Sequence, residues 1–424
     1  MLWKLNFILW FSLIITLLYS CDQSPKTTPI KTPEPTKAEV HYTYYLPSDS
    51  LNIKSILIIM DPHGEPNLIM DSLQLVSNQN NIALLGLPEI SNGISNHQFI
   101  IQRDLKDFIQ SKNLQNIKLY LLGFSGAARM ATVYAQNNRI DGLLLCGAGL
   151  GRQTELPFPT VLMAGMGDFN FMEQYYSPSD PRTFQKNTIA LHFYGKHQWP
   201  PAEIITDAIG FIENRAKNTG NEMAKEFEIK SESYFQKGAY YLSFKYSEAA
   251  YKLSNEAEDE QRRNKLVALS NNKRVKNYFQ QLNTMMEEEQ KRYSILSESL
   301  TSKDSIWWKN QINFIENKST NSTNTIESQS YTRTLAYMGI LMYSRLNATI
   351  AGRGQYALIP TYLSIYERIE PDNPDLYFFK AVYAYTQSND ADALLFLQKA
   401  KDLGFNNLPL MNKFFSQDFI NTLQ

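Results

Sequence analysis

The chain has little cysteine and little histidine. Its 424 residues include only two cysteines, Cys21 and Cys146, and five histidines. No group of His, Cys and acidic residues has the spacing of a metal site, and no glycine-rich loop of the phosphate-binding kind is present. The sequence therefore predicts a protein that works with neither a metal nor any other cofactor.

An excess of charge of either sign is also missing. Lys and Arg number 41, Asp and Glu number 42, and the formal net charge is −1. No basic patch indicates a nucleic acid as partner. Hydrophobic residues make up 43% of the chain and charged residues 20%, which is typical of folded proteins, and the length is sufficient for two domains.

The first 20 residues form the strongest local signal. One Lys near the start precedes an apolar run that ends in Leu-Tyr-Ser-Cys at positions 18–21. Residues 1–20 resemble a bacterial lipoprotein signal peptide, which implies cleavage after Ser20 and a diacylglycerol on the Cys21 thiol. A plain membrane-anchor helix is the alternative. The Pro-, Thr- and Lys-rich residues 21–39 predict a flexible tether.

A lipid on Cys21 has two consequences. The protein would be attached to a membrane in the cell envelope, facing either the periplasm or the surface. Enrichment in Asn, Ile, Lys and Tyr, together with Asp22 after the cysteine, indicates a Gram-negative source. Cys146 would then be the only free thiol, which excludes a disulfide within the mature chain. Its position in the apolar run LLLCG predicts a small buried side chain.

Residues 40–216 alternate between strand and helix patterns. Unbroken apolar runs such as KSILIIM, KLYLLGF and PTVLMAG end in turn residues, as strands buried on both faces do. Segments with helical spacing separate them, for example residues 66–80, 97–112 and 201–217. This alternation predicts an α/β domain with a mostly parallel sheet and helices on both faces.

Residues 217–424 carry helical patterns only, interrupted by the low-complexity segment NKSTNSTNT at 317–325, which predicts a loop. After Pro371, aromatic and small residues recur at a spacing that resembles a tetratricopeptide repeat (TPR), and a looser match lies 34 residues earlier. A third fragment of this kind is GAYYLSFKYSEAAYKLS at 238–254. The sequence predicts an all-α helical-repeat domain, with a non-repeating helical bundle as the alternative.

Ser125 is the candidate nucleophile. It lies in LLGFSGAARMA, where an apolar strand passes directly into a helix and small residues surround the serine. This strand–turn–helix context is what a nucleophile elbow requires, and the amides at the start of the helix would face an oxyanion. The alternative is a serine that caps the helix.

A serine hydroxyl needs a base, and the base needs an acid that orients it. Two histidines follow the serine in the chain. His197 lies in a loop after a strand, whereas His192 lies inside the strand ALHFY, so His197 is the predicted base. Asp168, at the end of VLMAGMGD, is the predicted acid, with Glu173 and Asp180 as runners-up. A turn or capping residue is the alternative for Asp168.

These motifs together resemble the α/β-hydrolase superfamily, in particular dienelactone-hydrolase-like and depolymerase-like esterases. The resemblance covers residues 40–216 and is carried by LLGFSGA, AGMGD, FYGKHQWPP and DPHGEP. It implies a Ser-Asp-His triad with an oxyanion hole formed by backbone N–H groups of Gly126 and of the His63–Gly64 loop. A loop histidine that only forms hydrogen bonds is the alternative for His63. Two residues depart from the family pattern, Ala127 in the elbow and Lys196 before the base.

Two features bear on the substrate. Only LGRQTELPF separates two of the strands, so no lid domain fits there and the site should be open unless the helical region covers it. Apolar side chains follow the acid strand and would either line the site or pack against the C-terminal helices: Met166, Phe169, Phe171, Met172, Tyr175 and Tyr176.

The main hypothesis is a lipid-anchored serine hydrolase that cleaves a carboxylic ester or, less readily, a peptide, in a small molecule or a polymer. An envelope lipase or depolymerase is a further possibility. The alternative is a catalytically silent hydrolase-fold scaffold whose TPR-like region binds a protein or peptide. The two hypotheses differ in whether Ser125 Oγ and His197 lie within hydrogen-bond distance.

Overall fold

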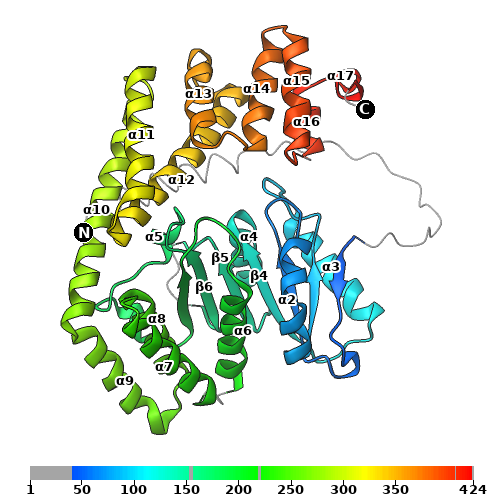
Figure 1. Cartoon of the computed structure of the whole chain (residues 1–424). Coiled ribbons are helices and arrows are strands. Elements are labelled where there is room, and N and C mark those ends of the chain that lie inside the picture. The colour runs from blue at the N-terminus through cyan, green and yellow to red at the C-terminus, as the bar shows by residue number, and fades with distance from the viewer. Residues whose placement is uncertain (1–40, 152–155, 218–220, 406, 423–424) are drawn as a thin grey trace. The chain divides into compact units, whose positions relative to one another are not determined.

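The structure is a computed structural model (Figure 1). It describes residues 41–151, 156–217, 221–405 and 407–422. The predicted signal peptide, Cys21 and the tether lie outside these residues. The chain divides into two compact units, Met1–Phe279 and Gln280–Gln424, each of which is considered by itself.

The first unit contains a seven-stranded sheet in the order β1-β3-β2-β4-β5-β6-β7. Strand β1 is antiparallel to β3, and the remaining neighbours are parallel. From β2 onward the strands are short and largely apolar, and they are buried along their whole length except at Lys118 and Leu119 of β4. The strands are β1 (Thr43–Tyr45), β2 (Ser55–Met60), β3 (Ile82–Gly86), β4 (Lys118–Phe124), β5 (Gly142–Cys146), β6 (Thr160–Gly165) and β7 (Thr188–Phe193).

Helices cover both faces of this sheet because alternate strand residues point to opposite sides. On one face Leu57, Leu122 and Val161 share a buried cluster with residues of α2 and α6. On the other face Ile58, Leu121 and their neighbours pack against α3 and α4. These helices are α2 (Asn67–Asn80), α3 (His97–Ser111), α4 (Ser125–Asn137) and α6 (Ala202–Lys217). The predicted α/β architecture is therefore confirmed.

The register of the sheet places the ends of its central strands side by side. Met60 of β2 pairs with Gly123 of β4, and Phe124 of β4 pairs with Cys146 of β5. Gly165 of β6 pairs with Phe193 of β7. The loops that leave these strands consequently meet at the carboxyl ends of the strands, which is where ligands bind in open parallel sheets.

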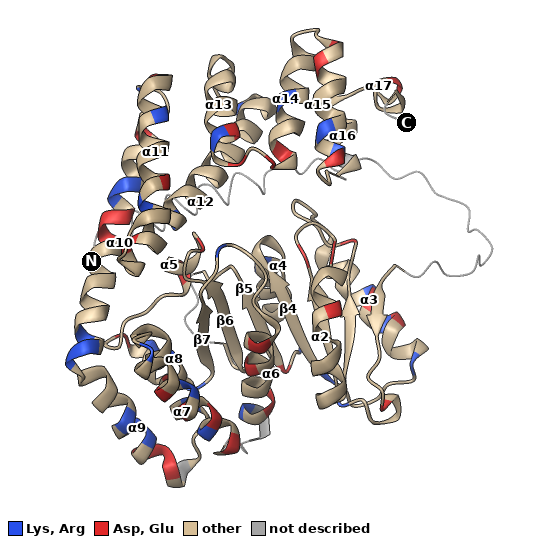
Figure 2. Cartoon of the chain, viewed as in Figure 1, with Lys and Arg blue, Asp and Glu red and all other residues tan. Residues whose placement is uncertain are grey.

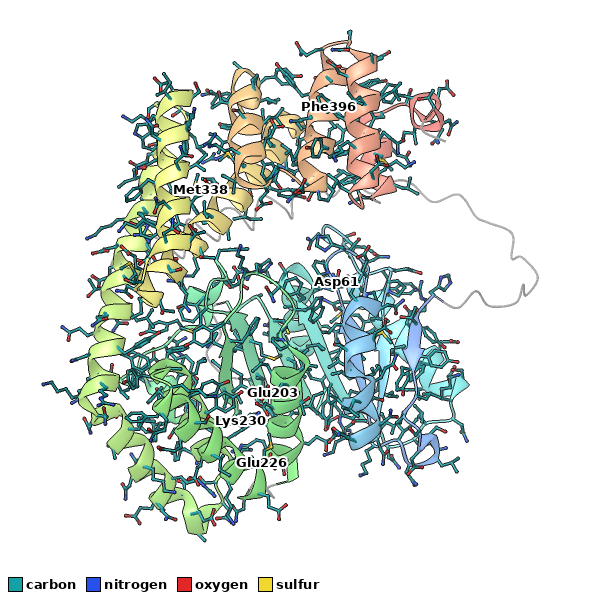
Figure 3. The ribbon with its side chains drawn as sticks, viewed as in Figure 1. Asp61, Glu203, Glu226, Lys230, Met338 and Phe396 are labelled. Atoms are coloured by element: carbon teal, nitrogen blue, oxygen red, sulfur yellow. The ribbon has the colours of Figure 1, made fainter. Side chains whose placement is uncertain are left out.

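The first unit extends beyond the strands through three helices, α7 (Asn221–Gln236), α8 (Tyr240–Leu253) and α9 (Glu256–Asn271). Helix α8 packs against the edge strand β7 and is buried over most of its length. Helix α7 is tied to α6 by Lys230, whose ammonium donates to Glu203 and Asp207 at 3.0 and 2.7 Å (Figure 3). The helices α7–α9, which follow the predicted boundary at residue 216, thus belong to the compact unit that holds the sheet.

The second unit is helical. Its helices are α11 (Ser305–Asn321), α12 (Thr325–Ala348), α13 (Ile359–Ile369), α14 (Pro374–Thr386), α15 (Asp390–Asp402), α16 (Leu408–Phe414) and α17 (Gln417–Asn421). The division between the units falls within α10 (Lys273–Ser299). Helices α14 and α15 pack closely, and the small residues Ala381, Ala393 and Ala400 are fully buried. The TPR-like character of this region stays a prediction.

One loop prediction was wrong in extent. The low-complexity segment at 317–325 was expected to be a loop, yet α11 continues to Asn321. The hydroxyls of Ser319 and Thr320 donate to the carbonyl of Glu316 at 2.9 and 2.8 Å. These bonds keep the polar side chains within the last helical turn, so composition alone did not end the helix.

Charged side chains lie mainly on the helices and loops rather than on the sheet strands (Figure 2). In the second unit Arg333 of α12 donates to Glu289 of α10 at 2.6 Å, and both of these charged side chains are fully buried. Among the described helices, none combines the length with the apolar character that crossing a bilayer requires.

Candidate active site

Ser125 lies at a sharp turn between β4 and α4. Its φ of 51° falls in the left-handed region, which costs a residue with a side chain about 1–2 kcal/mol. Gly123 makes this turn possible, because a Cβ there would lie 2.7 Å from the Cα of Ala128. Ala127 and Ala128 are fully buried at the same contact. The small residues therefore let helix and strand approach each other and hold the serine in its strained conformation.

The structure brings the three predicted triad residues together. His197 Nε2 lies 2.9 Å from Ser125 Oγ, and His197 Nδ1 lies 2.9 Å from Asp168 Oδ2. A carboxylate that accepts from Nδ1–H leaves Nε2 with a lone pair toward the hydroxyl. His197 is 72 positions from Ser125 and 29 positions from Asp168 in the chain. The arrangement of the strands, and not local sequence, therefore brings the three residues together.

Two phenylalanines flank the His197 imidazole. The ring of Phe124 lies 4.8 Å from it between centroids, and the ring of Phe169 lies 4.7 Å away. The indole of Trp199 lies 5.1 Å from Phe124 and extends this aromatic stack. The stack restricts rotation of the imidazole, so it preserves the geometry between the serine and the acid. Of the apolar residues after the acid strand, Phe169 places its ring against the imidazole of the triad.

The Asp168 carboxylate is fully buried and held on both oxygens. Oδ1 accepts the backbone N–H of Asn170 at 2.8 Å, while Oδ2 faces His197. The two runners-up for the acid have other partners. Glu173 accepts from Arg129 and from the Gly149 N–H at 2.9 and 3.0 Å. Asp180 caps a short 3₁₀ turn (η2, Pro181–Phe184) and pairs with Arg182.

Glycines provide the space that the base needs. A Cβ on Gly147, whose φ is 62°, would lie 3.0 Å from Cε1 of His197 and 3.1 Å from its Nδ1. A Cβ on Gly165 would lie 2.4 Å from the carbonyl oxygen of Gly195 in the loop that carries the histidine. Side chains at these two positions would displace the imidazole or its loop.

The predicted oxyanion donors differ in availability. Gly126 is in the first turn of α4, where helix N–H groups have no intrahelical acceptor. The N–H of His63 donates to Asp61 Oδ1 at 2.7 Å, and the N–H of Gly64 donates to the Asp61 carbonyl at 3.2 Å. Both backbone donors of the His63–Gly64 loop are therefore engaged by Asp61.

Asp61 is a residue that the sequence analysis missed. Asp61 is 3% exposed and lies at the carboxyl end of β2 (Figure 3), and its Oδ2 accepts Trp199 Nε1–H at 2.9 Å. Burial raises the pKa of this carboxyl, but the hydrogen bonds from His63 and Trp199 outweigh it and leave the pKa below the usual value. Asp61 is therefore ionised at neutral pH. Its hydrogen bond to Trp199 links the loop after β2 to the loop that carries His197. Its position in the DPHG motif was the available signal.

His192 and several of the apolar residues after the acid strand lie in packed surroundings. His192 is buried in β7, its Nδ1 lies 2.9 Å from the hydroxyl of Tyr241, and burial lowers its pKa well below the usual value. Phe171 and Tyr175 contact the Tyr241 ring on α8, and Tyr176 donates to Glu248. These aromatic side chains therefore pack against α8.

Cys146 is buried and free at the end of β5. Burial, together with the charge of Asp168, raises the pKa of its thiol well above the usual value. Within the described residues, no group of three or more His, Cys, Asp and Glu side chains is arranged to hold a metal ion.

A scan against protein-family models and searches of curated proteins and of solved structures found no match to this chain.

Proposed function

We propose that this chain is a serine hydrolase of the α/β-hydrolase type that cleaves carboxylic esters. The observation that carries the proposal is the continuous hydrogen-bonded series Ser125 Oγ, His197 and Asp168, with both links at 2.9 Å. Support also comes from the strained Ser125 between a central strand and a helix, and from the chain order Ser, Asp, His.

In the proposed reaction, Ser125 Oγ attacks the ester carbonyl as His197 Nε2 takes its proton. The buried Asp168 carboxylate stabilises the imidazolium that forms, and the Gly126 N–H donates to the oxyanion. The imidazolium then protonates the leaving alkoxide, which departs as an alcohol. Water attacks the acyl-enzyme with His197 as base, which releases the acid and restores the serine.

The scaffold hypothesis requires that Ser125 Oγ and His197 lie too far apart for proton transfer. Their distance of 2.9 Å favours hydrolysis over that alternative. The attachment of a lipid to Cys21, the envelope location and a protein partner for the helical region remain proposals from the sequence.

A panel of acetyl and long-chain esters and short peptides tests the proposal on the purified full-length chain. We expect ester hydrolysis that falls about 10⁶-fold in Ser125→Ala and about 10⁴-fold in Asp168→Asn. Ser95→Ala, at an exposed serine in the loop before α3, is the control and should retain full activity. Absence of hydrolysis in the wild type, or equal rates in Ser125→Ala, would end the proposal.

A further inference from the structure

The loop between β3 and α3 brings a polar side chain to the nucleophile elbow. A Cβ built on Gly126 would lie 2.0 Å from Asn92 Oδ1 and 3.7 Å from Asn92 Nδ2. The Gly126 backbone nitrogen and this Cβ position are bonded to the same Cα. The terminal amide of Asn92 therefore lies beside the N–H group that begins the oxyanion hole.

The backbone of Asn92 is fixed in this place. Its N–H donates to the carbonyl of Pro62 at 2.8 Å, and the preceding residue, Ser91, forms an antiparallel bridge with His63. A Cβ on Gly64, whose φ is 78°, would lie 2.5 Å from the Pro88 carbonyl, so the loops after β2 and β3 are in close contact. The Asn92 side chain itself is exposed, as a group that meets a substrate must be.

An oxyanion hole usually supplies two donors, and Gly126 supplies one. The backbone candidates for the second, the N–H groups of His63 and Gly64, already donate to Asp61. An asparagine side chain has two N–H donors, and it fills this role in other hydrolases. Rotation about χ2, a broad torsion in asparagine, exchanges the positions of Oδ1 and Nδ2.

We propose that the Asn92 side-chain amide is the second oxyanion donor, and hence a catalytic residue. The inference rests on the proposed ester hydrolysis at Ser125. As the carbonyl oxygen gains negative charge, Nδ2–H of Asn92 and the N–H of Gly126 both donate to it. The bond strengthens in the transition state, so its removal lowers kcat more than it changes KM.

Asn92→Leu and Asn92→Asp test the proposal, because both remove the donor at a similar side-chain size, and the leucine does so without a negative charge that would itself repel the oxyanion. We expect kcat for a short ester to fall about 10²- to 10³-fold, with KM changed by less than about 3-fold. Affinity for an alkyl trifluoromethyl ketone, which forms an oxyanion adduct on a serine, should fall in parallel with kcat. The control is Asn96→Asp, at an exposed N-cap of α3 that makes no side-chain capping bond.

A double-mutant cycle adds a second, geometric test. Gly126→Ala places a methyl group against Asn92 and should displace its amide, with a loss of kcat similar to that of Asn92→Ala. In the Asn92→Ala background the methyl group has room, so the double variant should resemble Asn92→Ala alone. Additive losses would contradict the proposal.

The outcomes also separate this inference from the proposed function. An active wild type whose Asn92→Leu variant keeps kcat within about 3-fold overturns the role of Asn92 and leaves ester hydrolysis standing. A wild type that neither hydrolyses esters nor binds the ketone overturns both.

Discussion

Gly147→Ala should impair catalysis more than its effect on stability accounts for. The new Cβ would lie 3.0–3.1 Å from atoms of the His197 ring and 3.0 Å from Phe124, which is closer than ordinary carbon contacts. The φ of 62° adds a backbone cost of about 1–2 kcal/mol for any L side chain. To relieve the contact, the imidazole must move by a few tenths of an ångström from its 2.9 Å bond with Ser125.

A displacement of 1 Å in a catalytic group costs about 10²-fold in rate. The smaller shift in Gly147→Ala should therefore lower kcat/KM about 10-fold. The assay is steady-state hydrolysis of a short ester, together with urea unfolding of the same sample. Unfolding should show a loss of about 1–2 kcal/mol from the backbone.

The chain offers a matched control. Gly151, in the same connection after β5, has a φ of 66° and no atom within 4 Å of its Cβ position. Gly151→Ala should lose similar stability and keep its activity. Full activity in both variants, or an equal loss of activity in both, would refute the reasoning that the imidazole requires glycine at position 147.

Three further predictions concern buried ionisable groups. Glu248→Gln leaves the buried ammonium groups of Lys245 and Lys252 without their carboxylate and should lower the unfolding free energy by about 3–5 kcal/mol in urea titrations. Asp61→Asn should cost about 1.5–3 kcal/mol at pH 7. Because the folded pKa of Asp61 is lowered, this difference should persist above about pH 4 and shrink as the pH falls further. Equal losses at pH 7 and pH 3 would contradict that assignment. Iodoacetamide should label the Cys146 peptide only after unfolding, since burial raises the pKa of this thiol; rapid labelling of the folded chain would be inconsistent with the structure.

Several parts of the fold could be predicted from the sequence because they depend on local patterns. The apolar runs of β2 and β4 are buried on both faces, and such runs end at turn residues that can be identified in the sequence. The elbow was recognisable because Gly123, Ser125 and Ala127 lie within five consecutive residues of the chain. The preference for His197 over His192 followed from its place in a loop rather than in a strand.

Other features depend on contacts between distant segments. Asp61 and Trp199 are 138 positions apart, and Asn92 reaches the elbow only because β3 and β4 lie on either side of β2. Helix α8 shows a different limit. Its helical pattern resembles a repeat, but its burial comes from packing against β7, and no periodicity distinguishes those two environments.

The central claim is that Ser125 is an activated nucleophile, and a fluorophosphonate probe tests it most directly. The probe phosphonylates an activated serine hydroxyl with loss of fluoride, and mass spectrometry of the digested full-length chain locates the adduct. The account predicts one adduct on the Ser125 peptide, none in Ser125→Ala, and slow labelling in His197→Gln. A wild-type chain that carries no adduct, or carries it on another residue, would contradict the account.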